Sequence, residues 1–242
     1  MISIKQLASA FTCLSFALSA TVVHANPELV KTAVEAWLKG KYKVEGVSKS
    51  PVSGLYEVRI GTDIIYVDEK GQHAFVEGQL IDIKANKNLT QERVDEILKV
   101  NFDDLPLDIA LKQVIGNGKR RLAVFEDPNC PHCRTTRQSL NDLKDITLYT
   151  FTYPILAADS EIKVKQALCA KDKVKAWNDL MLDRKIPAND GSCVTSLPKI
   201  IELGRKLRVT GTPTIIFANG KRVPGGVPPE QLRKLVDENS KV

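Results

Sequence analysis

Two cysteines separated by two residues are the part of this sequence best suited to chemistry. Cys130 and Cys133 stand in the stretch FEDPNCPHCRTTRQSL, after an apolar run and at the start of a helix-like pattern. A thiol at a helix N-terminus lies near the positive end of the helix dipole and near unpaired amide groups, and both favour the thiolate. We therefore expect thiol–disulfide exchange, with Cys130 as the nucleophile that carries a mixed disulfide and Cys133 as the resolving thiol.

The two residues between the cysteines are expected to tune this exchange. Pro131 fixes the backbone at the first helical position, where its missing amide is not needed. His132 is expected to stabilise a Cys130 thiolate by its charge or by a hydrogen bond. A more stable thiolate makes the disulfide easier to reduce, so the pair becomes more oxidising.

A metal site is the main alternative reading of a Cys-x-x-Cys pair. Zinc sites of this type usually need a second such pair, and the sequence has none. The three histidines, His24, His73 and His132, have no spacing typical of ligands. A purely structural disulfide across so short a ring would constrain little of the chain. We expect no metal and no other cofactor.

Cys169 and Cys193 are expected to form a structural disulfide. Their surroundings, Ala-Leu-Cys-Ala at 167–170 and Gly-Ser-Cys at 191–193, are typical of a helix joined back to a loop. Closing a loop of this length stabilises a fold by roughly 3.5 kcal/mol in the chain-entropy treatment.

The first 25 residues are predicted to be a secretory signal peptide. Lys5 is their only charged residue, an apolar run covers 7–20, and Val23-His24-Ala25 has the small-x-small pattern of a cleavage site. The run is too short for a membrane anchor, so the mature chain is expected to begin at Asn26 and to be soluble. A compact signal and an even number of remaining cysteines favour a bacterial periplasm. The net charge of +6 is scattered, which does not indicate nucleic-acid binding.

The elements that position the cysteines are predicted to form an α/β domain over residues 119–242. Pro213 in Gly211-Thr212-Pro213 precedes an apolar strand, and a cis Thr212–Pro213 loop facing Cys130 would present the Thr212 backbone to a substrate. Strands and helices alternate, which indicates a mixed sheet. The strands are expected at 122–125, 146–153, 214–217 and 222–223, and the helices at 130–143, 161–182, 197–207 and 229–238.

The preceding residues are predicted to form a small α+β domain, 26–86, and a helical linker, 87–118. Asn26-Pro27-Glu28 is a typical helix start, and Gly40 ends that helix. So small a core is marginal alone, and an edge strand near 74–80 is expected to be the site for pairing with a second copy. Strands are expected at 55–60, 63–67, 73–77 and 79–84, and linker helices near 90–98 and 109–115.

Several motifs resemble those of the thioredoxin superfamily and, within it, the DsbC/DsbG family of periplasmic disulfide isomerases. They are Cys-Ala-Lys-Asp-Lys at 169–173, Gly-Thr-Pro at 211–213, Asn-Gly at 219–220, Val-Pro-Gly at 223–225 and Pro-Pro at 228–229. The resemblance covers essentially the whole mature chain.

That resemblance implies a two-domain α+β protein. Its N-terminal domain would be cystatin-like and would pair two copies into a V-shaped homodimer, and its C-terminal domain would be a thioredoxin fold with a helical insertion. The shared apolar cleft would hold misfolded exported proteins, and a membrane reductase of the DsbD type would keep the cysteines reduced. By position, Cys130 would be the nucleophile and Cys133 the resolving thiol. Thr212 and Pro213 would form the substrate-binding cis-proline loop, and Cys169–Cys193 the second disulfide.

One departure leaves the redox direction open. Pro131-His132 is typical of the oxidase DsbA, where DsbC-like proteins often carry Gly-Tyr, and it predicts a more oxidising pair. The leading hypothesis is therefore an isomerase, and the alternatives are a DsbA-like dithiol oxidase and a holdase chaperone that does not need its thiols.

Overall fold

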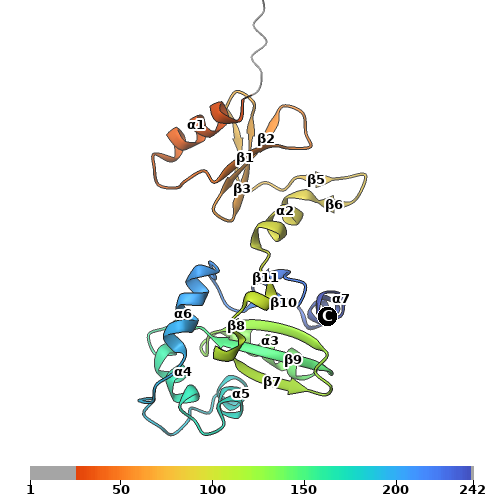
Figure 1. Ribbon diagram of the computed structural model, residues 1–242. Helices are drawn as coiled ribbons and strands as arrows, with labels where there is room; N and C mark the ends of the chain where they lie inside the picture. The colour runs from red at the N-terminus through yellow and green to blue at the C-terminus, as the bar shows by residue number, and fades with distance from the viewer. Residues whose placement is uncertain (1–25, 241–242) are drawn as a thin grey trace, which may run out of the picture. The chain divides into compact units, whose positions relative to one another are not determined.

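The computed structural model describes residues 26–240, and the chain divides after Gly78 into two compact units (Figure 1). The predicted signal peptide, 1–25, lies outside the described residues. Within residues 26–240, no helix has both the length and the apolar character needed to cross a membrane.

The first unit packs one helix on a four-stranded antiparallel sheet. Helix α1 (Pro27–Leu38) begins as predicted, because the Asn26 side chain accepts a hydrogen bond from the Glu28 amide. The sheet has the order β1 (Gly46–Lys49), β2 (Leu55–Ile60), β3 (Asp63–Asp68) and β4 (Ala74–Phe75). Its core consists of Val30, Val34, Val44, Tyr56, Val58, Ile65 and Val67.

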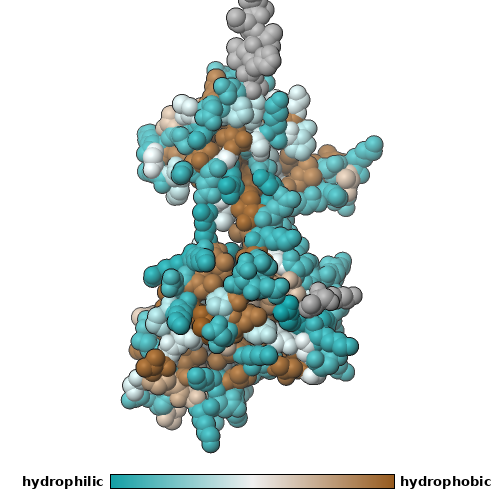
Figure 2. Space-filling model, in the orientation of Figure 1, coloured by the Kyte–Doolittle hydropathy of each residue, from teal (hydrophilic) through white to brown (hydrophobic). Residues whose placement is uncertain are grey.

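Strand β4 is one of the two edge strands of this sheet among the described residues, and β1 is the other. It is shorter than the predicted strand at 73–77, because only Ala74 and Phe75 pair with β3. The Phe75 side chain and that of Val76 remain exposed, at 62% and 51%. Apolar residues reach the surface on both units (Figure 2). In the first unit, the exposed edge therefore lies in the segment where the sequence predicts one.

The second unit begins with a hairpin and a helix. Strand β5 (Ile81–Asp82) pairs with β6 (Lys87–Asn88), and helix α2 (Leu89–Leu98) follows with Asn88 as its cap. The predicted strand at 79–84 is thus reduced to two residues. Two 3-10 turns, Phe102–Asp104 and Leu107–Ile109, continue the chain.

The predicted helix at 109–115 is wrong. Residues Leu111–Ile115 form strand β7, which pairs with β9 (Ile146–Thr152) in antiparallel register. Burial alternates along β7, as a strand requires, but the apolar Val114 is 55% exposed. Because an apolar valine stands at an exposed position, the sequence does not show the alternation of polar and apolar residues that would indicate a strand.

The second unit is built on a mixed sheet, as the sequence predicts, but the sheet has five strands, because β7 joins the four that were expected. Strand β8 (Arg120–Glu126) lies at its centre and runs parallel to β9, and every other pairing is antiparallel. The order is β11 (Arg222–Pro224), β10 (Thr214–Phe217), β8, β9 and β7.

Helices cover both faces of this sheet. Alternate β8 residues point to opposite sides: Leu122 and Val124 pack with α3 (Pro131–Asn141) and α7 (Pro229–Asn239), and Ala123 and Phe125 pack with α6 (Leu197–Lys206). Helices α4 (Ser160–Leu168) and α5 (Lys173–Asp183) are inserted between β9 and α6 (Figure 1). Since β8 leads into α3, the cysteine pair lies where the central strand ends.

Candidate active site

A buried carboxylate fixes the loop that leads to Cys130. Asp127 directly follows β8 and is 0% exposed. Its side chain joins this loop to the segment after β9 and to the start of α4, through hydrogen bonds from four donors. These donors are the amides of Asn129 (2.7 Å), Ile155 (2.7 Å) and Leu156 (2.9 Å) and the hydroxyl of Ser160 (2.9 Å).

Cys130 is the N-cap of helix α3, the position that the sequence predicts. Its sulfur accepts a hydrogen bond of 3.1 Å from the Cys133 amide, and Pro131 occupies the first helical turn. The sulfur thus receives one of the unpaired donors at the helix N-terminus, where the dipole also favours negative charge.

The two thiols are free, and their pKa values are shifted in opposite directions. The pKa of Cys130 is lowered from 9.0 to about 6, chiefly by the side-chain hydrogen bond with Cys133, while burial opposes the shift. The Thr212 side chain and the hydrogen bond from the Cys133 amide lower it as well. The pKa of Cys133 is raised far above its usual range, first by burial, then by the hydrogen bond with Cys130 and the charge of Glu126. At neutral pH, Cys130 is the thiolate and Cys133 keeps its proton.

A cis-proline loop lies against the Cys130 sulfur. The Thr212–Pro213 peptide bond is cis, the isomer that the sequence predicts. The Cys130 thiol donates to the Thr212 carbonyl oxygen at 3.2 Å, and the Gly225 amide donates to the Pro213 carbonyl oxygen at 2.7 Å. The buried Thr212 hydroxyl has no hydrogen-bond partner in the described structure. It is therefore available to the sulfur once the Cys130 proton has left.

His132 does not make the hydrogen bond that the sequence suggests. Among the residues described, the hydrogen bonds of the Cys130 sulfur involve Cys133 and Thr212. His132 is exposed, and a Cβ built on Gly226 would lie 3.1 Å from the His132 Cβ. The close approach of the loop after β11 places the histidine beside Gly226, and Pro131 next to it is exposed as well.

A buried charged cluster below the helix is the feature that the sequence prediction missed. Glu126, at the end of β8, forms an ion pair with Arg137 of α3, and their side chains are 0% and 2% exposed. The Trp177 indole donates to Glu126 Oε2 at 2.8 Å, and Arg137 donates to the Thr150 hydroxyl at 2.7 Å. Two features of the sequence could have indicated this ion pair: a charged residue at the end of an apolar strand, and an arginine one helical turn after Cys133.

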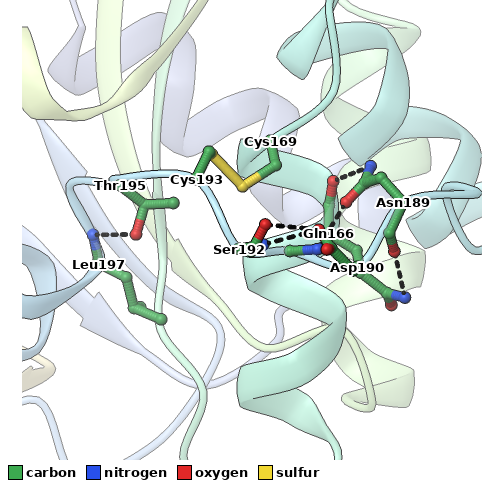
Figure 3. Close-up of a disulfide and its surroundings, with 9 residues drawn as sticks. Gln166, Cys169, Asn189, Asp190, Ser192, Cys193, Thr195 and Leu197 are labelled. Atoms are coloured by element: carbon green, nitrogen blue, oxygen red, sulfur yellow. Dashed lines mark hydrogen bonds between the residues drawn. A yellow bond between two sulfur atoms is a disulfide. The ribbon is translucent and has the colours of Figure 1, made fainter.

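Cys169 and Cys193 are joined in a disulfide, as the sequence predicts (Figure 3). The bond ties the end of α4 to the loop before α6. The same loop is held by Gln166 and Asn189, whose side-chain amides each donate to the other's backbone carbonyl at 2.9 Å. The described residues hold no cluster of three His, Cys, Asp or Glu side chains that would suit a metal.

Comparison with known proteins matches both parts of the chain. A family model described as "Disulfide bond isomerase protein N-terminal domain" matches residues 21–91, and one described as "Thioredoxin-like domain" matches residues 107–240. The second model alone covers more than half of the sequence.

Named relatives and a solved structure agree with these models. A probable thiol:disulfide interchange protein DsbC of Bordetella avium is 43% identical over 194 residues, covering 80% of this chain and 69% of the relative. The thiol:disulfide interchange protein DsbC of Escherichia coli K12 is 28% identical over 207 residues, covering 83% and 84%. A disulfide interchange protein from Neisseria gonorrhoeae superposes with a TM-score of 0.54 at 36% identity, over 57% of this chain and 100% of that one.

Proposed function

The chain belongs to the DsbC family of thiol:disulfide interchange proteins, and we propose that it isomerises incorrect disulfides in exported proteins through Cys130. The observation that carries this proposal is the asymmetry of the two thiols. Cys130 is ionised at neutral pH with its pKa near 6, and Cys133 is buried and protonated. A nucleophile of this kind attacks existing disulfides, while the neighbouring Cys133 stays protonated and does not react until a mixed disulfide has formed.

The exchange proceeds in two stages. The Cys130 thiolate attacks one sulfur of a client disulfide, forms a mixed disulfide and releases the other client sulfur as a thiolate. A different client thiolate then attacks the mixed disulfide and restores Cys130, so the client is rearranged without net oxidation. In the competing route Cys133 attacks Cys130, which leaves an oxidised pair and a reduced client.

The surface around Cys130 supports binding of unfolded, apolar segments. Ile155 and Leu156 are 39% and 52% exposed, and their amides are bound to the carboxylate that fixes the Cys130 loop. Thr212 contacts the sulfur through its carbonyl oxygen, and Thr212 and Pro213 form the substrate-binding loop of this proposal. Misfolded proteins expose apolar chain, and these groups offer it a place next to the nucleophile.

We further propose that the protein is a periplasmic homodimer, paired through its first unit. The outer edge of β4, one of the two edges of the sheet, is open to a further strand, and the side chains of Phe75 and the adjacent Val76 are exposed there. Pairing of two such edges would extend the sheet and cover these side chains. A membrane reductase of the DsbD type would keep the cysteines reduced, since an isomerase needs a free Cys130 thiolate to start each cycle.

One observation favours a second function, that of a dithiol oxidase. Pro131-His132 between the cysteines is typical of DsbA, and a pKa near 6 at Cys130 stabilises the reduced pair, which makes the oxidised pair a better oxidant. The β4 edge and the match to the isomerase N-terminal domain favour the isomerase.

Reactivation of a scrambled client separates these functions. The purified protein is added to a client with several wrong disulfides in a glutathione buffer, and the recovery of client activity is followed. An isomerase restores activity, and Cys130→Ser abolishes the effect. Rapid oxidation of a reduced client without reactivation of the scrambled one would instead establish an oxidase. A variant with Ser at both 130 and 133 that still prevents client aggregation would show thiol-independent holdase activity.

A further inference from the structure

Glu126 and Arg137 form a buried ion pair beside the helical turn that carries the resolving thiol, and only one oxygen of the Glu126 carboxylate is hydrogen-bonded within the described residues. Arg137 follows Cys133 by one helical turn on the buried face of α3, and the two residues are 1% and 0% exposed. Glu126 ends β8 four residues before Cys130. The resolving thiol and the ion pair therefore share the interface between the active-site helix and the end of the central strand.

The hydrogen bonds of the Glu126 carboxylate all converge on one oxygen. Arg137 Nε donates to Oε2 at 3.1 Å, Arg137 Nη2 donates to the same atom, and the Trp177 indole donates to it at 2.8 Å. The other oxygen, Oε1, is buried and has no hydrogen-bond partner in the described structure. Oε1 therefore carries its share of the carboxylate charge without a hydrogen-bond donor from the described part of the chain, in surroundings that screen charge poorly.

We propose that Glu126 is a positioning residue that slows the attack of Cys133 on the mixed disulfide, and so lengthens the time for which a client remains bound to Cys130. This inference rests on the proposed isomerase function, because only an isomerase benefits from a long-lived mixed disulfide. Attack by Cys133 requires its thiolate, and a fixed carboxylate nearby disfavours that anion. The raised pKa of Cys133 agrees, since burial, the hydrogen bond with Cys130 and the charge of Glu126 all contribute to it.

The step that Glu126 would slow is fully defined. The Cys133 thiol loses its proton to solvent, its sulfur bonds to the Cys130 sulfur, and the bond between Cys130 and the client sulfur breaks. The client leaves as a thiolate, reduced by two electrons, and the Cys130–Cys133 pair is oxidised by two. Rearrangement by a second client thiolate does not involve Cys133, so Glu126 shifts the balance toward rearrangement.

Oxidised glutathione measures this step without any protein client. The reduced full-length protein is mixed with increasing oxidised glutathione, and the rate that no longer depends on its concentration reports resolution by Cys133. We expect Glu126→Gln to raise this rate by about three- to tenfold, the size of a partly compensated buried charge effect. Glu126→Asp keeps the carboxylate and should stay close to the original rate. Glu202→Gln, an exposed change on α6, is the matched control.

A pH profile separates the effect of charge from a change in structure. The groups that act on the Cys133 thiol are Cys130 on the same helix, Glu126 on β8, the Asp127 backbone and the Thr212 side chain. Arg137 is the ion-pair partner of Glu126. In Glu126→Gln, the rise of the resolution rate with pH should begin at lower pH than in the original protein. The pair Glu126→Gln with Arg137→Gln removes both charges and keeps two amides able to hydrogen-bond, so it should show a smaller shift in the same direction.

The inference is overturned if resolution is unchanged in Glu126→Gln while circular dichroism shows a native fold. A slower rate would also overturn it, because Glu126 would then act as a proton acceptor for Cys133. Both results are independent of isomerase activity, since glutathione release is measured even if no client is ever reactivated.

Discussion

The Cys130 thiol donates a hydrogen bond of 3.2 Å to the carbonyl oxygen of Thr212, 82 residues further along the chain. The nucleophile and the cis-proline loop are thus in direct contact. The bond exists only while the sulfur is protonated, because a thiolate has no proton to donate. On ionisation the sulfur keeps the hydrogen bond from the Cys133 amide and can also accept one from the Thr212 hydroxyl, which lacks another partner among the described residues.

Alkylation of Cys130 should follow its lowered pKa. We expect the rate with iodoacetamide to rise with pH and to reach half its maximum near pH 6. Cys133→Ser should be used beside the unaltered protein, so that only Cys130 reacts. A midpoint near pH 9 in the unaltered protein would show that the helix N-terminus and its partners do not stabilise the thiolate.

The same shift links the stability of the reduced protein to pH. The pKa of Cys130 is lower in the folded protein than the ordinary 9.0 of an unfolded chain. The resulting stabilisation is complete above about pH 9 and is lost as pH falls toward 6. Chemical denaturation of the reduced protein should show this loss, and Cys130→Ser should lack that component of the pH dependence.

Thr212→Val should raise the pKa of Cys130. The substitution keeps the branched shape of the side chain and the cis-proline loop but removes the hydroxyl that stabilises the thiolate. The alkylation midpoint should move to higher pH, by less than the full distance to 9.0, because the Cys133 donors remain. Thr212→Ser retains a hydroxyl and should leave the midpoint close to its original value.

The site was more predictable from sequence than the linker was. Cys130, Cys133, Cys169, Cys193 and Pro213 stand in local patterns whose chemistry follows from residue type and spacing. Strand β7 was missed because its position depends on pairing with β9, and the exposed Val114 conceals the alternation that would reveal a strand. The ion pair of Glu126 with Arg137 could not be read from either residue alone, since it forms only when α3 packs on the sheet.

A charge on the β4 edge should weaken the proposed dimer. Val76→Lys places an ammonium group beside Phe75, where an incoming edge strand would have to bury it. We expect sedimentation equilibrium to show a monomer over a wider concentration range, with the fold of each unit retained. Val114→Lys makes the same change at an exposed valine of the second unit and should not alter the association. If both variants associate as strongly as each other, β4 does not lie in the dimer interface.

Removal of the Cys169–Cys193 disulfide should lower stability and leave the chemistry intact. The double change to serine frees a loop with a sequence separation of 24, which in the chain-entropy treatment costs about 3.5 kcal/mol. The Gln166–Asn189 bonds still hold this loop, so the measured loss should fall below that figure. Denaturant unfolding gives the loss, and glutathione exchange at Cys130 should proceed at its original rate. A large drop in that exchange rate would give the disulfide a part in the reaction.

Gly204→Ala should destabilise the protein, although alanine normally favours a helix interior. Gly204 lies in α6, where this exchange would ordinarily gain up to about 1 kcal/mol. A Cβ at this position would lie 2.4 Å from Cε2 of Tyr153, whose ring packs in the buried cluster around Phe125. Overpacking of this kind typically costs about 1–3 kcal/mol, so the net change in unfolding free energy should be a loss.

A substitution of Tyr153, the residue that the new methyl group would meet, provides the control for this prediction. Tyr153→Leu removes the part of the ring that the new methyl group would meet, and it loses some buried apolar contact of its own. In the Tyr153→Leu background, Gly204→Ala should therefore be neutral or stabilising, and a double-mutant cycle of denaturant unfolding should give a favourable coupling energy. Additive losses from the two changes would show that Tyr153 is not what makes glycine necessary in α6.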